Sequence, residues 1–180
     1  TFDVETVSAG VVNSNCTSEA NKLYAKVRVT NTGKFSGKEV VQVYIAKPQG
    51  KLGKPAKELA AFEKTRELQP GESQLMILTW EINDMASYDD LGKVKKSAYV
   101  LEAGSYDIYV GTSVRDVTKA DYSYILNHDV ITEQLSAKLV PTSLPKRMLA
   151  DGSYEALPQS EPVDSDYSAI GNIDPSLTEG

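Results

Sequence analysis

Two runs of alternating residues within positions 27–46 constrain the fold of this chain more than any other feature. In the first run valines alternate with polar residues, and in the second Val41, Val43 and Ile45 do the same. Because successive side chains of a strand point to opposite faces, this period of two indicates strands that are buried on one side only. The polar segment between the runs contains Asn, Gly and Ser, which predicts a turn that pairs the two strands. The expected architecture is therefore a packed β-sandwich.

Further runs of apolar residues extend this pattern along the chain. Additional strands are expected over residues 2–6, 58–68, 74–82, 97–101, 105–110 and 120–126. Together with the absence of a long amphipathic helix, they predict an all-β, immunoglobulin-like sandwich of about seven strands over residues 1–130.

Three local patterns refine this expectation. Gln-Pro-Gly-Glu at residues 69–72 predicts a type II turn, because Pro presets its own φ and Gly accepts a positive φ. Both faces of the strand over residues 74–82 are apolar, which predicts a central strand covered on both sides. Residues 83–89 break the strand pattern and predict one helical turn with Asn83 or Asp84 as its cap.

Two segments lack the strand pattern over a longer distance. Residues 47–57 contain four lysines, two prolines and two glycines, which predicts a long exposed loop that would contact a neighbouring domain. Residues 131–180 are interrupted by prolines and become acidic toward the end. Because they offer little apolar surface to offset the entropy lost on ordering, we expect an extended linker or tail rather than a second domain.

Composition narrows the classes of partner. A net charge of −6 and an isoelectric point near 4.9 argue against a nucleic-acid partner, which would require a basic surface. No apolar run approaches the roughly 20 residues that a membrane-spanning helix needs. The chain begins without Met and without a signal-peptide pattern, and we expect it to be a segment of a larger protein. The sequence does not indicate a compartment.

Few residues could carry chemistry. His128 and Cys16 are the only histidine and cysteine, so the sequence has no ligand cluster at zinc or copper spacing and no pair for an internal disulfide. No Gly-x-Ser-x-Gly motif supplies a partner for His128. Asp89 with Asp90, or Asp84 with Asp89, could be considered as a glycosidase carboxylate pair, but these residues fall in a short connector where Asp is common as a cap or turn residue. We therefore expect no catalytic, cofactor-binding or metal-binding residue.

Aromatic residues raise the alternative of sugar binding. Trp80 shares its face with Met76 and Leu78, so the expected place of its ring is the core rather than an exposed sugar platform. Tyr88 and Tyr99 lie near a connector and a strand start, where their position is open.

Five motifs in order between residues 27 and 116 closely resemble the fibronectin type III-like domain of glycoside hydrolase family 3, which contains β-glucosidases. They are VTNTG at residues 29–33, GKEVVQVY at 37–44, PAKELAAFEK at 55–64, LQPGE at 68–72, and GSY at 104–106 followed by VGTS at 110–113. Residues 149–158 also resemble the connector of members whose domain order is permuted, with the barrel after this module.

The resemblance implies both partners and a division of labour. In the family, the nucleophilic Asp belongs to a TIM-like barrel and the acid/base Glu to an α/β sandwich domain, and no segment of this chain matches either. The resemblance thus implies a non-catalytic structural module that braces those two domains in an enzyme hydrolysing O-glycosyl bonds, without direct sugar binding. An independent carbohydrate-binding module and an adhesion-type sandwich module remain the alternatives.

Overall fold

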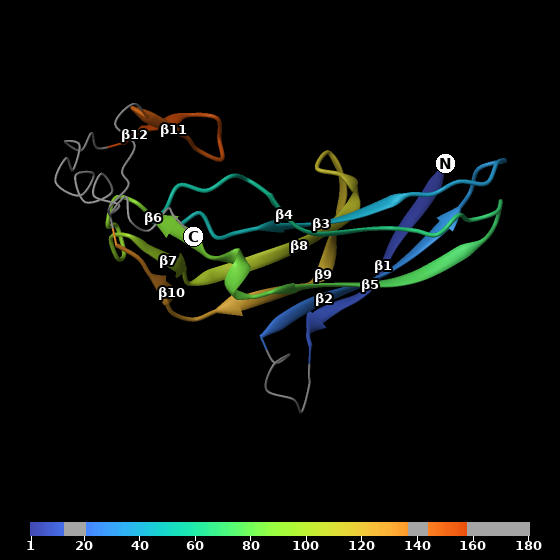
Figure 1. Cartoon of the computed structure of the whole chain (residues 1–180), viewed down its shortest axis with the longest axis horizontal. Coiled ribbons are helices and arrows are strands. Elements are labelled where there is room, and N and C mark those ends of the chain that lie inside the picture. Colours follow the sequence, from blue (N-terminus) through green and yellow to red (C-terminus); the bar gives the residue numbers. More distant parts are fainter. Residues whose placement is uncertain (13–20, 137–143, 158–180) are drawn as a thin grey trace, which may run out of the picture.

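The computed structural model describes residues 1–12, 21–136 and 144–157, and two antiparallel sheets dominate it (Figure 1). The three-stranded sheet has the order β1-β2-β5, and the four-stranded sheet has the order β4-β3-β8-β9. Their strands are β1 (Phe2–Val11), β2 (Lys22–Asn31), β3 (Val40–Ala46), β4 (Glu58–Lys64), β5 (Ser73–Glu81), β8 (Gly104–Ser113) and β9 (Asp116–Leu126). This arrangement confirms the predicted all-β, immunoglobulin-like sandwich.

Shorter elements gather at one end of the sandwich. A small sheet of order β10-β7-β6 lies there, and a separate two-stranded hairpin lies above it, while the N-terminus lies toward the other end (Figure 1). These elements are η1 (Asn83–Met85), β6 (Ser87–Asp89), β7 (Ala98–Leu101), β10 (Val130–Gln134), β11 (Lys146–Met148) and β12 (Tyr154–Ala156). We call this region the polar end, because buried polar residues hold it together.

The core lies between the two main sheets and follows the alternation of the sequence. Val27 of β2 and Val43 of β3 are fully buried, and so are the other inward positions of these strands. Trp80 is 5% exposed and belongs to the same cluster, which confirms that its ring serves the core. Tyr106 on β8 is 1% exposed and its hydroxyl donates to the carbonyl oxygen of Glu102 at 2.9 Å, similar to the tyrosine corner of other sandwich folds.

The predicted pairing of the two runs within residues 27–46 is wrong. The first run lies in β2, which pairs with β1 and β5, whereas the second lies in β3, which pairs with β4 and β8. Residues 32–39 therefore cross from one sheet to the other instead of closing a hairpin. The buried Asn31 side chain secures this crossing by donating to the carbonyl oxygens of Phe35 and Leu68 at 2.8 and 2.9 Å. Alternation specifies which face is buried but not which strand is the neighbour.

The expectation that both faces of the strand over residues 74–82 are covered is also wrong. β5 is an edge strand bonded only to β2, and Leu75 and Ile77 on its outer face are 50% and 59% exposed. The outer face of β5 is therefore apolar and open to solvent in this chain.

The turn and the connector on either side of β5 match expectation in part. Gly71 has φ +79°, and the Glu72 amide donates to the Gln69 carbonyl oxygen at 2.9 Å, as a type II turn requires. The predicted helical turn is the 3₁₀ helix η1, but its N-cap is Ile82 and no side chain caps it. The cap expected at Asn83 or Asp84 is therefore wrong.

Ordered structure continues past residue 130. β10 pairs with β7, and residues 144–157 contain the β11–β12 hairpin rather than an extended segment. Ion pairs hold this hairpin, so its scarcity of apolar residues does not prevent it from forming. Cys16 and residues 137–143 and 158–180 lie outside the described residues, and the division into 1–130 and 131–180 stays a prediction.

Candidate docking surface and its polar support

The Asp89 side chain stabilises a turn of the backbone. The residue is fully buried, and its carboxylate accepts backbone N–H groups from four residues of the segment that follows β6. The donors are Gly92, Lys93, Val94 and Lys95, at 2.7, 3.0, 2.6 and 2.7 Å. Burial alone would raise the pKa of Asp89, but the four donors outweigh burial and lower the pKa below its ordinary value. This stabilisation is present above the ordinary pKa and is lost as the pH falls through the lowered value.

The other residues considered for chemistry lie apart from any shared centre. Asp90 forms an ion pair with Arg147 at 3.1 Å, Asp84 is exposed in η1, and His128 is exposed between β9 and β10. Within the described ranges, no three His, Cys, Asp or Glu residues are grouped as a metal site would need. None of the helical segments in that part of the chain has the length and apolar character that crossing a membrane requires. The expectation of no catalytic or ligand-binding residue stays a prediction.

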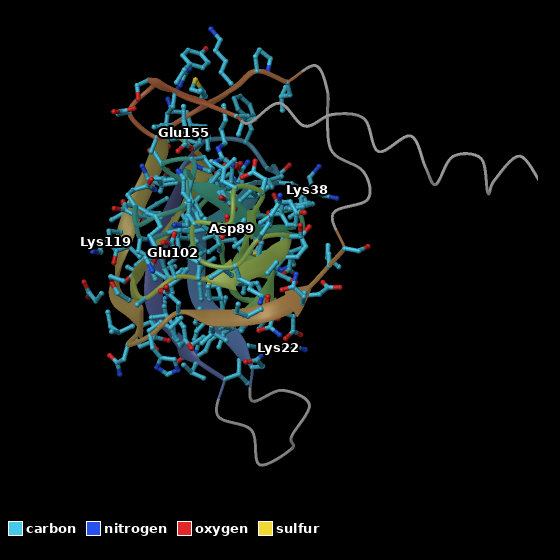
Figure 2. The ribbon with its side chains drawn as sticks, turned by 90° about the vertical axis from the view of Figure 1, so that its left-hand side faces the viewer. Lys22, Lys38, Asp89, Glu102, Lys119 and Glu155 are labelled. Atoms are coloured by element: carbon cyan, nitrogen blue, oxygen red, sulfur yellow. The ribbon has the colours of Figure 1, made fainter. Side chains whose placement is uncertain are left out.

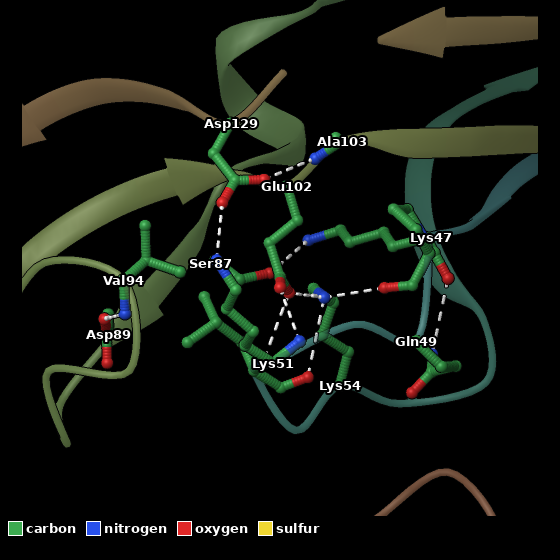
Figure 3. Close-up of polar contacts among 12 residues, drawn as sticks. Lys47, Gln49, Lys51, Lys54, Ser87, Asp89, Val94, Glu102, Ala103 and Asp129 are labelled. Carbon is green, nitrogen blue, oxygen red and sulfur yellow. Dashed lines mark hydrogen bonds and ion pairs between the residues drawn. The ribbon is translucent and has the colours of Figure 1, made fainter. Parts of the chain in front are cut away.

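Glu102 is the centre of the polar end. Its carboxylate accepts the backbone N–H groups of Lys51 and Leu52 at 2.5 and 3.1 Å and pairs with the ammonium group of Lys54 (Figure 3). The side chains of Lys54 and Glu102 are 1% and 3% exposed. Lys54 also donates to the carbonyl oxygen of Pro48 at 2.6 Å. The lysine-rich loop of residues 47–57 is therefore folded onto a buried carboxylate. The expectation of an exposed loop is wrong for Leu52 and Lys54, which are buried, and it holds for residues 49–51.

Neighbouring charges reinforce this arrangement. Lys47, also buried, forms an ion pair with Glu58 at 2.5 Å. Asp129 accepts the backbone N–H of Ala103 at 2.8 Å and the ammonium group of Lys51 at 3.1 Å, and these two donors lower the pKa of Asp129. The lysine-rich loop is thus fixed at several points to β4 and to the segments that flank β8 and β10.

The β11–β12 hairpin packs onto the same end through Arg147. Its guanidinium donates to Asp90 at 3.1 Å and to Glu155 at 2.9 Å, and Glu155 also pairs with Lys93. Both cations lower the pKa of Glu155, with Lys93 the larger cause. An end-on view shows Asp89 and Glu102 within the outline of the molecule and Glu155 on the hairpin (Figure 2).

The lysine-rich loop and the hairpin approach each other closely. A Cβ atom at Gly53 would lie 2.6 Å from Cδ2 of Leu149, so a larger residue there would force the Leu149 side chain to move. On the side of the loop that faces Glu102, a Cβ atom at Gly50 would lie 2.5 Å from Oε1 of Glu102. A larger residue at position 50 would therefore collide with the Glu102 carboxylate. These two glycines are needed for close approach rather than for an unusual φ.

β4, which follows the lysine-rich loop, presents an exposed apolar surface. Leu59 and Phe62 are 50% and 68% exposed, and they pair with Tyr44 and Gln42 on the outer face of the four-stranded sheet. Tyr44 in turn pairs with Tyr109, whose ring lies 4.8 Å from the ammonium group of Lys57. Tyr44 itself is only 9% exposed, so the exposed part of this face consists of Leu59 and Phe62 with the half-buried Tyr109 beside them, and we call these three residues the docking surface.

The alternation of the sequence does not reveal this surface. Leu59 and Phe62 are three residues apart, so strict alternation would place them on opposite faces. The register of β3 with β4 shifts between Val43 and Tyr44, and this bulge brings Leu59 and Phe62 to the same outer face.

The buried pair predicts unequal roles for the lysines of one loop. Replacing Lys54 with Met leaves the Glu102 carboxylate buried without its cation, so the free energy of unfolding should fall by about 3–5 kcal/mol. The matched control is Lys51→Met, which removes a side chain that pairs with Asp129 from an exposed position and should change stability by less than about 1 kcal/mol. Urea unfolding of both variants provides the measurement. Equally small losses would contradict a structural role for the buried pair.

Comparisons with known proteins agree with this architecture. Residues 39–114 match the fibronectin type III-like domain family. The chain is 62% identical to β-glucosidase A of Butyrivibrio fibrisolvens over 151 residues. This matched segment is 84% of this chain and 18% of that protein. The chain is 44% identical over 150 residues to a β-glucosidase of Ruminococcus albus, covering 81% of this chain and 16% of that protein.

Solved structures give the same result. A β-glucosidase from Paenibacillus barengoltzii matches 95% of this chain and 20% of its own, with a TM-score of 0.75 and 40% identity. β-Glucosidase 3B from Thermotoga neapolitana matches 74% of this chain and 17% of its own, with a TM-score of 0.62 and 34% identity. The chain thus spans about a fifth or less of the length of these relatives. Residues 39–114 are thus similar to a fibronectin type III-like domain, and most of the proteins that the chain resembles in sequence and structure are β-glucosidases, among them the GH3 β-glucosidase of Bifidobacterium adolescentis.

Proposed function

We propose that this chain is a non-catalytic structural module of a β-glucosidase-like enzyme that hydrolyses O-glycosyl bonds, and that it braces the catalytic domains. The observation that carries the proposal is the docking surface, where Leu59 and Phe62 are exposed on a rigid sheet. Exposed apolar side chains of this size mark a contact that the isolated chain does not make. The relatives are β-glucosidases of which this chain matches about a fifth or less, so most of the proposed enzyme lies outside it.

The carboxylates at the polar end support a structural rather than a catalytic role. A general acid or a nucleophile must reach its substrate, and the glycosidase mechanism uses two such groups on opposite sides of the bond. Asp89 and Glu102 are instead buried and saturated with donors from their own chain. Their role in this proposal is to fix the loops beside the docking surface.

The proposed partners are an α/β sandwich domain and a TIM-like barrel domain of the same enzyme. β4 is an edge strand, so its outer face is accessible to a neighbouring domain from the side as well as from above. Lys57 and Lys64 border the surface and offer charges for the rim of such a contact, whose centre would be apolar. Contacts between domains of one chain typically bury about 600–1,500 Å².

The first test of this proposal concerns activity. The 180-residue chain, purified alone, should hydrolyse neither an aryl β-glucoside nor cellobiose above the rate of buffer, because no segment of it resembles those that carry the nucleophile and the acid/base of the family. The measurement is release of the chromophore or of glucose at high protein concentration. Hydrolysis that persists through purification and disappears in an Asp84→Asn or Asp90→Asn variant would refute the proposal.

The second test concerns docking. In a longer chain that includes the catalytic domains, Phe62→Ser should remove a contact between domains and lower the free energy of unfolding by at least about 1 kcal/mol, seen as a lower melting temperature. The same substitution in the isolated chain should have little effect, because the ring is already 68% exposed there. Lys57→Glu and Lys64→Glu should show the same difference with a smaller magnitude, because they lie at the rim.

Ile125→Ser provides the matched control for docking. Ile125 is 59% exposed on β9, at the opposite edge of the same sheet, so its replacement should leave both proteins nearly unchanged. Equal effects of Phe62→Ser in the long and short chains would show that the docking surface serves the sandwich alone.

A further inference from the structure

Two tyrosines form an exposed pair at the polar end. Tyr88 of β6 and Tyr99 of β7 lie directly opposite each other in the small sheet. Their ring centroids are 5.4 Å apart and the ring planes are inclined by 57°, so each ring restrains the other. Each residue nevertheless remains 38% exposed, which leaves part of its surface free for a ligand.

A hollow of about 400 Å³ lies beside Tyr99. It is lined by Asn83, Asp84, Ala86, Tyr99, Thr132 and Glu133. The size falls within the range of roughly 300–1,000 Å³ that is typical of small-molecule sites. η1, β7 and β10 each contribute to the lining, and β10 is fixed to β7 by strand pairing and by the Thr132 hydroxyl, which donates to the Tyr99 carbonyl oxygen at 3.3 Å. The walls therefore come from three connected elements rather than from one loop.

The lining groups match the chemistry of a sugar. Asp84 and Glu133 accept hydrogen bonds from hydroxyl groups, and the Asn83 amide both donates and accepts. An aromatic ring offers an apolar face to the C–H groups of a pyranose while the polar side chains bind its hydroxyls. No lysine or arginine belongs to the lining residues of the hollow, which disfavours a phosphate or carboxylate ligand.

We propose that this hollow, with Tyr99 as its stacking ring, binds a glucose unit of a β-linked oligosaccharide. The choice of sugar rests on the proposed function in a β-glucosidase-like enzyme. The site departs from the sequence-based expectation of no direct sugar binding, which placed the ring of Trp80 in the core and left the positions of Tyr88 and Tyr99 open. Tyr88 is the positioning residue, because it supports the Tyr99 ring without lining the hollow.

An open hollow with one stacking ring provides weak binding. Most of the ligand would remain in solvent, so a dissociation constant in the millimolar range is expected. Such a site contributes by raising the local concentration of oligosaccharide near the enzyme rather than by tight capture.

The test uses the 180-residue chain and cellotetraose in a ¹H–¹⁵N NMR titration. Saturable shifts are expected for the amide signals of Tyr99, Thr132 and Glu133, and Tyr99→Ala should weaken binding at least tenfold. Tyr99→Phe keeps the ring and should retain affinity within about twofold, which separates loss of stacking from loss of folding. Glu133→Gln, an exposed substitution, should weaken binding severalfold. Tyr154→Ala on the hairpin, 60% exposed, is the matched control and should leave binding unchanged.

Three results would overturn the site. They are the absence of shifts at millimolar cellotetraose, shifts that persist in Tyr99→Ala, and shifts produced by a lysine-rich peptide but not by the sugar. The last result would assign the two carboxylates to a basic protein segment. The docking experiment measures thermal stability in a longer chain, so bracing can hold while sugar binding fails, and the two failures are distinguishable.

Discussion

The pairing of Lys54 with Glu102 in the interior is the interaction on which the rest of the polar end depends. Placing two charges away from water is unfavourable by several kcal/mol per ion, so each must gain additional hydrogen bonds. Glu102 gains two backbone donors from the lysine-rich loop, and Lys54 gains the Pro48 carbonyl oxygen. The result is a loop whose course is determined by a carboxylate that lies about 50 residues later in the chain. That loop leads directly into β4, so the same pair positions the docking surface.

The sequence predicted inward-facing residues well, but it predicted strand neighbours poorly and placed the outer face of β5, where Leu75 and Ile77 are exposed, wrongly under cover. Val27, Val43 and Trp80 lie in the core as their alternation indicated, because the period of two depends only on the local backbone. The pairing of the two runs within residues 27–46 was wrong, because strand partners are chosen by contacts across the whole sandwich. The burial of Lys54 could not be predicted, since lysine is seldom buried and its partner is distant in sequence. The exposure of Phe62 depended on a bulge that composition does not reveal.

The exposed and buried residues divide the molecule into a self-sufficient interior and an exterior suited to neighbours. The interior between the sheets is apolar and closed. The exterior carries Leu59 and Phe62 on one sheet and Leu75 and Ile77 on the other, all of them at least half exposed. A module with such surfaces on both sheets is suited to lie between two domains, in agreement with the proposed bracing role. The polar end adds rigidity where apolar packing is sparse, through carboxylates that each hold several backbone donors.

Native-state hydrogen exchange tests most directly whether buried carboxylates fix the polar end. The Leu52 amide is held by Glu102, and the Val94 and Lys95 amides are held by Asp89. If these contacts are as rigid as the structure indicates, the three loop amides should exchange at neutral pH nearly as slowly as that of Val43 in the core strand β3. Fast exchange of the loop amides beside a protected Val43 would contradict the account, because the polar end would then open independently of the sandwich.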